Sequence, residues 1–143
     1  MSEMRFAVVS SGWHETATQG LIAAAVKAIE ERGMKYSVIR VGSSFQLPLV
    51  CKAALDMGAD GVVALGVVVR GATPHFEFLA DAITGGLMSV AIQTGKPVGF
   101  GVLTVNSEQQ ALERAGLRDS VESKGREAAE SAMDTAITLQ GLQ

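Results

Sequence analysis

The feature that most constrains the fold is an uninterrupted apolar run at residues 61–69, GVVALGVVV. A strand with one face in water alternates apolar and polar side chains, and this run shows no alternation. It has the length of a strand and falls well short of the roughly 20 apolar residues that a membrane-spanning helix needs. We therefore expect a strand buried on both faces, as in a parallel sheet covered by helices.

Segments with strand character alternate with segments of helical spacing along the whole chain. Short apolar, β-branched runs predict the strands. Apolar residues three and four positions apart predict the helices between them, and glycines supply most of the helix ends. The predicted strands are residues 5–10, 36–41, 61–69 and 97–103, and the predicted helices end near Gly33, Gly58, Gly95, Gly116 and Leu139.

Two of the helix starts carry capping signals. Thr73 followed by Pro74 is typical of an N-cap with proline at the first helical position. Ser107, with Gln110 three residues later, matches a capping box. Strands that alternate with helices require right-handed crossovers. We therefore expect one α/β domain over residues 1–143, with a four-stranded parallel sheet between two layers of helices.

The composition argues against several classes of function. Hydrophobic residues make up 48% of the chain and charged residues only 19%, an apolar excess that subunit interfaces would bury. A net charge of −3 disfavours a nucleic-acid partner, which needs a basic surface. A single cysteine excludes an intrachain disulfide, and two histidines without an acidic cluster disfavour a metal site. Because we see neither a signal peptide nor a membrane span, we expect a cytoplasmic oligomer.

Ligands of parallel sheets bind beyond the carboxyl ends of the strands. The strongest candidate there is the segment at residues 69–75, VRGATPH, where free N–H groups and the helix dipole would attract an anion such as phosphate. An ordinary capped turn between strand and helix gives the same pattern, and both interpretations stay open. His75 in the first helical turn is either a proton-transfer group or a solvent-facing residue. His14 is expected to be an exposed turn residue.

Aromatic and basic residues near the strand ends are further candidates. Trp13, the only tryptophan, can either stack on a heterocycle or plug the top of the core. Phe45 and Phe100 allow the same two interpretations, with core packing favoured. Arg114 and Lys124 can bind a phosphate or a polyol, although each also fits a solvated helix face.

Several segments, in the expected order, resemble the lumazine synthase family over nearly the whole chain. The most specific is ALGVVVRGATPHF at residues 64–76. Supporting segments are SFQLP at 44–48, GFGVLT at 99–104, EQQALERAG at 108–116 and Lys124-Gly125. The resemblance implies a flavodoxin-like three-layer α/β/α sandwich. It also implies an enzyme of riboflavin biosynthesis that condenses 5-amino-6-(D-ribitylamino)uracil with 3,4-dihydroxy-2-butanone 4-phosphate to 6,7-dimethyl-8-ribityllumazine.

The resemblance further implies roles for individual residues. Those that would contact the pyrimidine and its ribityl chain are Trp13, Ser44, Phe45, Gln46, Val67, Val68 and Val69. Those that would bind phosphate are Ala72, Thr73 and Arg114. Phe100 and Lys124 would complete the site from a neighbouring subunit, and His75 would transfer protons. Because the substrate amine is the nucleophile, the resemblance implies neither a cofactor nor a metal.

The chain departs from the family pattern at two places. Gly42-Ser43 stands where the family usually has Pro-Gly, and Gln46 stands where it usually has glutamate, so an acceptor is kept but its charge is lost. A non-catalytic flavin- or lumazine-binding protein on the same fold is the alternative function, and a purely structural shell protein is a third. The family forms pentamers, and the loop at residues 117–123 favours a free homopentamer over a 60-subunit shell. Riboflavin synthase is a further expected partner.

Overall fold

The computed structural model describes residues 3–143, and its four strands form one parallel sheet in the order β2-β1-β3-β4. The elements in chain order are β1 (Arg5–Ser11), α1 (Glu15–Glu31), β2 (Lys35–Val41), the short 3₁₀ helix η1 (Ser44–Gln46), α2 (Leu47–Asp56), β3 (Gly61–Val69), α3 (His75–Thr94), β4 (Val98–Val105), α4 (Glu108–Glu113) and α5 (Lys124–Gly141). The strand order is that of flavodoxin-like sheets. The predicted α/β class with a four-stranded parallel sheet is confirmed.

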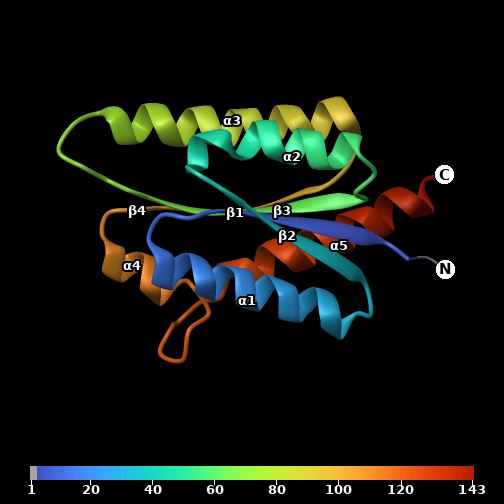
Figure 1. Cartoon of the computed structure of the whole chain (residues 1–143), viewed down its shortest axis with the longest axis horizontal. Coiled ribbons are helices and arrows are strands. Elements are labelled where there is room, and N and C mark those ends of the chain that lie inside the picture. Colours follow the sequence, from blue (N-terminus) through green and yellow to red (C-terminus); the bar gives the residue numbers. More distant parts are fainter. Residues whose placement is uncertain (1–2) are drawn as a thin grey trace.

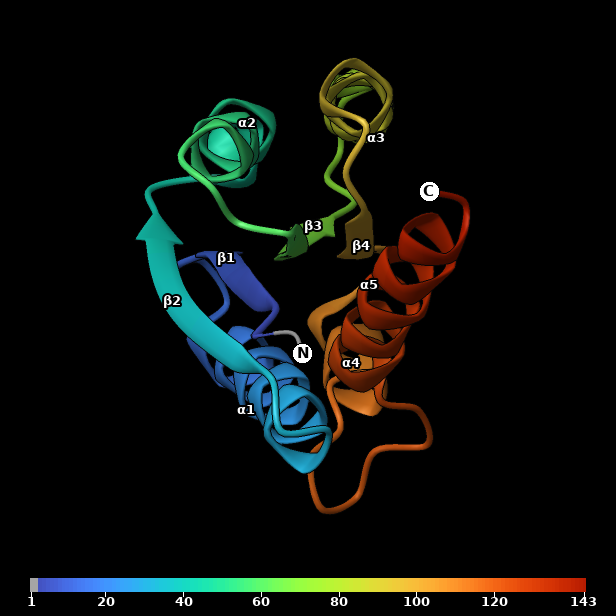
Figure 2. The same ribbon diagram turned by 90° about the vertical axis from the view of Figure 1, so that its right-hand side faces the viewer.

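Helices cover both faces of this sheet (Figures 1 and 2). The helices α2 and α3 lie on one face, while α1, α4 and α5 lie on the other. Each face has its own cluster of buried side chains. Leu21 and Met133 belong to the cluster on the α1 side, and Cys51 and Ile83 belong to the cluster beneath α2 and α3. The predicted three-layer arrangement is therefore confirmed.

The strand β3 explains the apolar run in the sequence. Its residues are buried from Gly61 to Val68, between β1 on one side and β4 on the other. Val63 and Leu65 point into the cluster on the α1 side, whereas Val62 and Ala64 point into the cluster beneath α2 and α3. Because both faces of the strand are covered, every position takes an apolar or small residue.

The strands end together at one edge of the sheet. Val41 of β2 lies beside Ser11 of β1, and Val105 of β4 lies beside Val69 of β3. In Figure 1 the connections that follow β1, β3 and β4 all lie at the left-hand end. This edge is where topology locates a ligand site.

The helix α5 packs very closely on its neighbours. A Cβ added to Gly125, in its first turn, would lie 2.2 Å from the carbonyl oxygen of Leu21 in α1. A Cβ added to Gly99 of β4 would lie 2.1 Å from the carbonyl oxygen of Ala128. Glycine at both positions therefore lets the backbone of α5 touch α1 and β4 directly.

A row of large apolar side chains on α3 faces outward. Phe78, Met88 and Ile92 are 71%, 64% and 75% exposed, and their spacing puts them on one stripe of the helix. We call these three residues the α3 stripe. Within residues 3–143, no helix combines the length and apolar character needed to cross a membrane.

The prediction for the start of α3 was wrong by one residue. The N-cap is Pro74 rather than Thr73, and no side chain makes a capping hydrogen bond at this helix. Pro74 has φ −70° and ψ 3°, outside the helical range, and its carbonyl accepts from the N–H groups of Glu77 and Phe78. Proline therefore precedes the helix instead of forming its first residue.

The predicted cap of α4 is confirmed in its main feature. The Ser107 hydroxyl accepts from the Gln110 N–H at 3.2 Å. The Gln110 side chain, however, accepts from the N–H of Asn106 and not from that of Ser107. In a capping box this second hydrogen bond would come from the N–H of the N-cap Ser107, whereas here it comes from the preceding residue, Asn106.

Candidate active site

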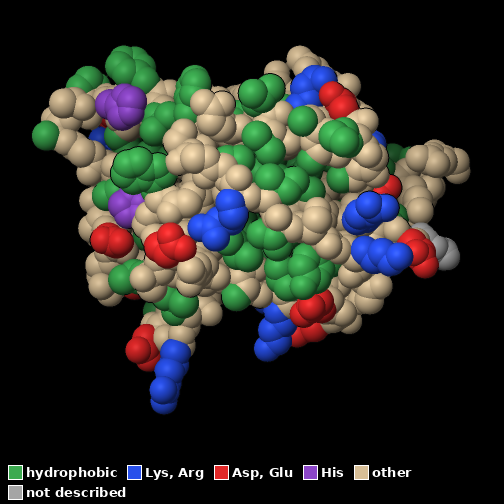
Figure 3. Space-filling model, in the orientation of Figure 1, with side chains coloured by type: hydrophobic (Ala, Val, Ile, Leu, Met, Phe, Trp, Pro, Cys, Tyr) green, Lys and Arg blue, Asp and Glu red, His purple; other side chains and the backbone are tan. Residues whose placement is uncertain are grey.

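A cavity of about 380 Å³ opens at the carboxyl ends of β1 and β3. We call it the sheet-end cavity. The residues that line it are Trp13, His14, Ser43, Ser44, Val67, Val68, Val69, His75 and Leu79. Six of the predicted site residues are therefore brought together from four separate segments. Figure 3 shows both histidines at the same end of the molecule. An aromatic ring, a histidine and strand-end backbone groups can bind a flat heterocycle and transfer a proton next to it.

A hydrogen bond fixes one edge of the Trp13 indole, while the face of the ring stays exposed to solvent. Its Nε1 donates a hydrogen bond to the carbonyl oxygen of Gly42 at 2.7 Å, and the side chain is 65% exposed. The ring therefore does not plug the core. An aromatic face fixed in this way is ready to stack on a planar ligand.

Small residues pack around Ser44, which lines the sheet-end cavity. Ser44 is buried, and a Cβ added to Gly66 would lie 2.7 Å from the Ser44 hydroxyl oxygen and 3.2 Å from that of Ser11. Glycine in the middle of β3 thus leaves space for two hydroxyl groups. The next two residues, Phe45 and Gln46, are exposed and do not line this cavity.

The turn at residues 71–74 joins β3 to α3 and is exposed throughout. Ala72 and Thr73 lie in it, immediately before the N-terminus of α3. The first backbone N–H groups of a helix have no intrahelical acceptor, and they carry the positive end of the helix dipole. The turn therefore has the chemistry of an anion site, next to His75 at the start of the helix.

The other predicted residues lie along the edge strand β4, in a second cavity of about 500 Å³. We call it the edge-strand cavity. Phe100 of β4 is 46% exposed there, and Arg114 and Lys124 also line it. This cavity and the sheet-end cavity have no lining residue in common. The predicted site thus forms two separate halves on one chain.

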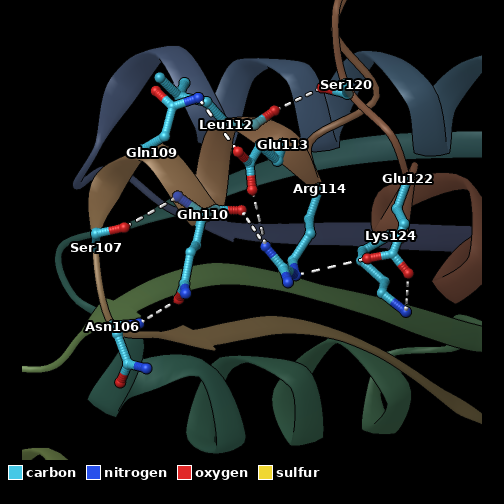
Figure 4. A network of polar contacts seen from close by, with 10 residues as sticks. All are labelled: Asn106, Ser107, Gln109, Gln110, Leu112, Glu113, Arg114, Ser120, Glu122 and Lys124. Carbon is cyan, nitrogen blue, oxygen red and sulfur yellow. Dashed lines mark hydrogen bonds and ion pairs between the residues drawn. The ribbon is translucent and has the colours of Figure 1, made fainter.

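The two cations of the edge-strand cavity share one carboxylate (Figure 4). Glu122 has one oxygen 3.5 Å from Arg114 Nε and the other 3.4 Å from Lys124 Nζ. Arg114 also donates to the carbonyl oxygen of Gln110 at 2.8 Å. A hydrogen bond to Glu127, together with the charges of Glu127 and Glu122, raises the pKa of Lys124 above its ordinary value, so the Lys124 ammonium stays charged.

Sequence reasoning underrated His14. The residue lines the sheet-end cavity, and its Nδ1 lies 3.5 Å from a carboxylate oxygen of Glu108. It is the only residue other than glycine with positive φ, 56°, within residues 3–143. A left-handed histidine between a strand and a helix is unusual, but the sequence shows only a histidine in a turn.

Arg70 was missed altogether. It follows β3, and its guanidinium contacts Glu77, Phe76 and Asn106. The segment VRGATPH contains it, so the signal was present. Its partner Asn106 lies 36 positions further along the chain, which a local pattern does not reveal.

Cys51 is remote from this chemistry. It is buried, and loss of solvation raises the pKa of its thiol to about 12, so it stays protonated. Within residues 3–143, no three histidine, cysteine, aspartate or glutamate residues come together as a metal site.

The geometry agrees with a comparison against known proteins. Residues 3–140 match the family model described as 6,7-dimethyl-8-ribityllumazine synthase. The chain belongs to the lumazine synthase family.

Relatives with the name 6,7-dimethyl-8-ribityllumazine synthase match almost the whole chain. The protein from Clavibacter sepedonicus is 54% identical over 95% of this chain and 85% of its own length. That from Leifsonia xyli subsp. xyli is also 54% identical, over 98% of this chain and 89% of its own length. The lumazine synthase of Streptomyces coelicolor is 46% identical over 99% of this chain and 89% of its own length.

Proposed function

We propose that this chain is a transferase of riboflavin biosynthesis that condenses 5-amino-6-(D-ribitylamino)uracil with 3,4-dihydroxy-2-butanone 4-phosphate. The products are 6,7-dimethyl-8-ribityllumazine, phosphate and water. The observation that carries the proposal is the convergence of Trp13, residues 67–69 and His75 on the sheet-end cavity. Membership of the lumazine synthase family supports the same reaction.

The pyrimidine binds in the sheet-end cavity. Its ring stacks on the open face of Trp13, and its polar edge meets main-chain groups of residues 67–69 at the end of β3. Ser44, Phe45 and Gln46 bind the ribityl chain from the segment η1, whose first residue, Ser44, lines this cavity.

The phosphate of the second substrate binds at the turn before α3. The free N–H groups beside Ala72 and Thr73 attract its negative charge through hydrogen bonds and the helix dipole. Arg114 of an adjacent subunit supplies a guanidinium for the same phosphate. Phe100 and Lys124 come from that same subunit, because they line the edge-strand cavity with Arg114.

The reaction needs proton transfers but no enzymic nucleophile. The pyrimidine amine attacks the ketone, and the resulting carbinolamine loses water to form an imine. Phosphate then leaves, and ring closure by the second nitrogen releases another water. His75 moves protons during these steps, and orientation of the two substrates supplies much of the remaining acceleration.

The active form is a homopentamer with its sites at subunit interfaces. Two observations support this assembly: the two halves of the site lie in separate cavities, and the α3 stripe exposes apolar side chains that a neighbour would cover. The length of the loop at residues 117–123 favours the free pentamer over a 60-subunit shell. The enzyme works in the cytoplasm and delivers its product to riboflavin synthase.

The test is to mix purified protein with both substrates and follow lumazine formation by absorbance and fluorescence. The spontaneous condensation is measured in parallel as the control. We expect a rate far above this control that saturates in both substrates. A rate equal to the control, from protein shown to be folded and pentameric, would overturn the proposal, and flavin binding by such protein would favour a carrier.

A further inference from the structure

Arg70 connects three elements at the carboxyl end of the sheet. Its backbone N–H donates to the carbonyl oxygen of Val105, and its Nε donates to Asn106 Oδ1 at 3.0 Å. Its Nη1 donates to a carboxylate oxygen of Glu77 in the first turn of α3. The guanidinium also lies over the ring of Phe76, 4.4 Å from its centroid. One side chain thus joins β3, the loop after β4 and the start of α3.

The turn at residues 71–74, which follows Arg70, makes few contacts of its own. Residues 71–74 are exposed, and no atom lies within 4 Å of a Cβ added to Gly71. No side chain caps the helix that follows, and Pro74 lacks an N–H to donate. The conformation of the turn is therefore fixed mainly at its two ends, where Arg70 precedes it and Glu77 follows it.

Glu77 creates an electrostatic problem for an anion at this turn. Its carboxylate lies in the first turn of α3, at the helix end whose N–H groups would bind phosphate. An unpaired negative charge there would oppose the helix dipole and repel a phosphate. The hydrogen bond from Arg70 lowers the pKa of Glu77, so the carboxylate is ionised and paired.

We propose that Arg70 is a positioning residue for the phosphate substrate: it fixes the turn at residues 71–74 and neutralises Glu77, so that the start of α3 attracts phosphate. The inference rests on the proposed function, because that function brings a phosphate to this turn. It adds a role for a residue that does not itself need to touch the substrate.

The experiment compares Arg70→Met, Glu77→Gln and the double variant with the unmodified pentamer. We expect Arg70→Met to raise the KM for the phosphate substrate about five- to tenfold, because repulsion by Glu77 replaces part of the dipole attraction. The KM for the pyrimidine should stay within twofold. The double variant should regain most of the lost affinity, since removing the carboxylate removes the repulsion. Arg70→Lys should keep most of the affinity for the phosphate substrate, because lysine keeps the positive charge beside Glu77.

Arg32→Met is the matched control. Arg32 makes a comparable exposed ion pair, with Nη1 2.7 Å from a carboxylate oxygen of Asp134, and it joins α1 to α5 rather than elements of the site. This variant should leave both KM values unchanged. Melting temperatures of all variants show whether any effect is a loss of folding.

The outcomes separate the inference from the proposed function. If the unmodified protein turns over but Arg70→Met keeps its KM for the phosphate substrate, the inference is wrong. Equal losses for both substrates without rescue by Glu77→Gln would also overturn it, because they indicate a general structural role. If the unmodified protein does not turn over, the proposed function fails, and calorimetric titration with inorganic phosphate still decides whether Arg70→Met weakens anion binding and Glu77→Gln restores it.

Discussion

The indole Nε1 of Trp13 donates to the carbonyl oxygen of Gly42 at 2.7 Å. This bond links the connection after β1 to the connection after β2, 29 positions away in the sequence. It fixes the edge of the ring and leaves the face open at the sheet-end cavity. The ring orientation is therefore set before any ligand binds.

Replacing Trp13 with alanine should weaken binding of 6,7-dimethyl-8-ribityllumazine. Loss of a stacked aromatic ring costs about 1–3 kcal/mol, so we expect the Kd to rise roughly five- to 150-fold. Trp13→Phe keeps a ring but loses the bond to Gly42, and a rise of about threefold to tenfold is expected. Calorimetric titration measures both, and unchanged affinity in Trp13→Ala would show that the ring does not stack.

His75→Asn should lower kcat about 100-fold, the usual scale of general acid–base assistance, and leave both KM values nearly unchanged. Asparagine keeps a polar group at the start of α3 but cannot carry the proton. Steady-state rates, corrected for the spontaneous reaction, measure the effect. A variant with normal turnover would remove His75 from the mechanism.

Two inactive variants should regain activity when they assemble together. His75→Asn damages the sheet-end half of the site and Arg114→Ala damages the edge-strand half. If neighbouring subunits share each site, random mixing in equal amounts leaves about a quarter of the sites with both halves intact. The variants are unfolded and refolded together, and each refolded alone is the control. No recovery in the mixed, folded assemblies would mean that each chain builds its own site.

Gly125→Ala should destabilise the chain by about 2–4 kcal/mol, because the added methyl group would lie 2.2 Å from the Leu21 carbonyl oxygen. Gly141→Ala, at the end of the same helix, has no atom within 4 Å of the added Cβ and is the matched control. Urea unfolding should show a change below about 0.5 kcal/mol for the control. Equal stability of the two variants would show that α5 shifts freely on α1.

Cys51 should resist thiol reagents while the protein is folded. Burial raises its pKa to about 12, so the reactive thiolate is absent at pH 8, whereas the unfolded thiol titrates near 9.0. The unfolded state therefore loses its proton first, and this group makes stability fall as pH rises from about 9 towards 12. A colorimetric thiol assay with and without urea measures the difference. Rapid reaction of the folded protein would contradict the burial.

The sequence predicted what depends on local pattern. The run at residues 61–69 predicted a strand buried on both faces, and the cap at Ser107 was correct because it needs only four consecutive residues. The start of α3 was wrong because Thr73-Pro74 fits two adjacent registers, and the ψ of proline decides between them. A one-dimensional pattern does not contain that angle.

Contacts between distant segments could not be predicted in this way. Nothing near Trp13 indicates that its ring would be held by Gly42, and nothing near Arg114 indicates that Glu122 would lie between it and Lys124. The left-handed backbone of His14 is likewise set by how β1 meets α1. The division of the site into two cavities becomes visible only when the sheet edge and its helices are seen together.

The close contact of α5 with α1 and β4 has a consequence for synthesis on the ribosome. Ala128, Ala129 and Met133 of α5 complete the buried cluster on the α1 side of the sheet, and α5 follows all four strands in the chain. Until that helix leaves the exit tunnel, the emerging chain exposes Leu21 and its neighbours to water and to other nascent chains. Folding of this face is therefore completed only after α5 has emerged, when every strand of the sheet has already been made.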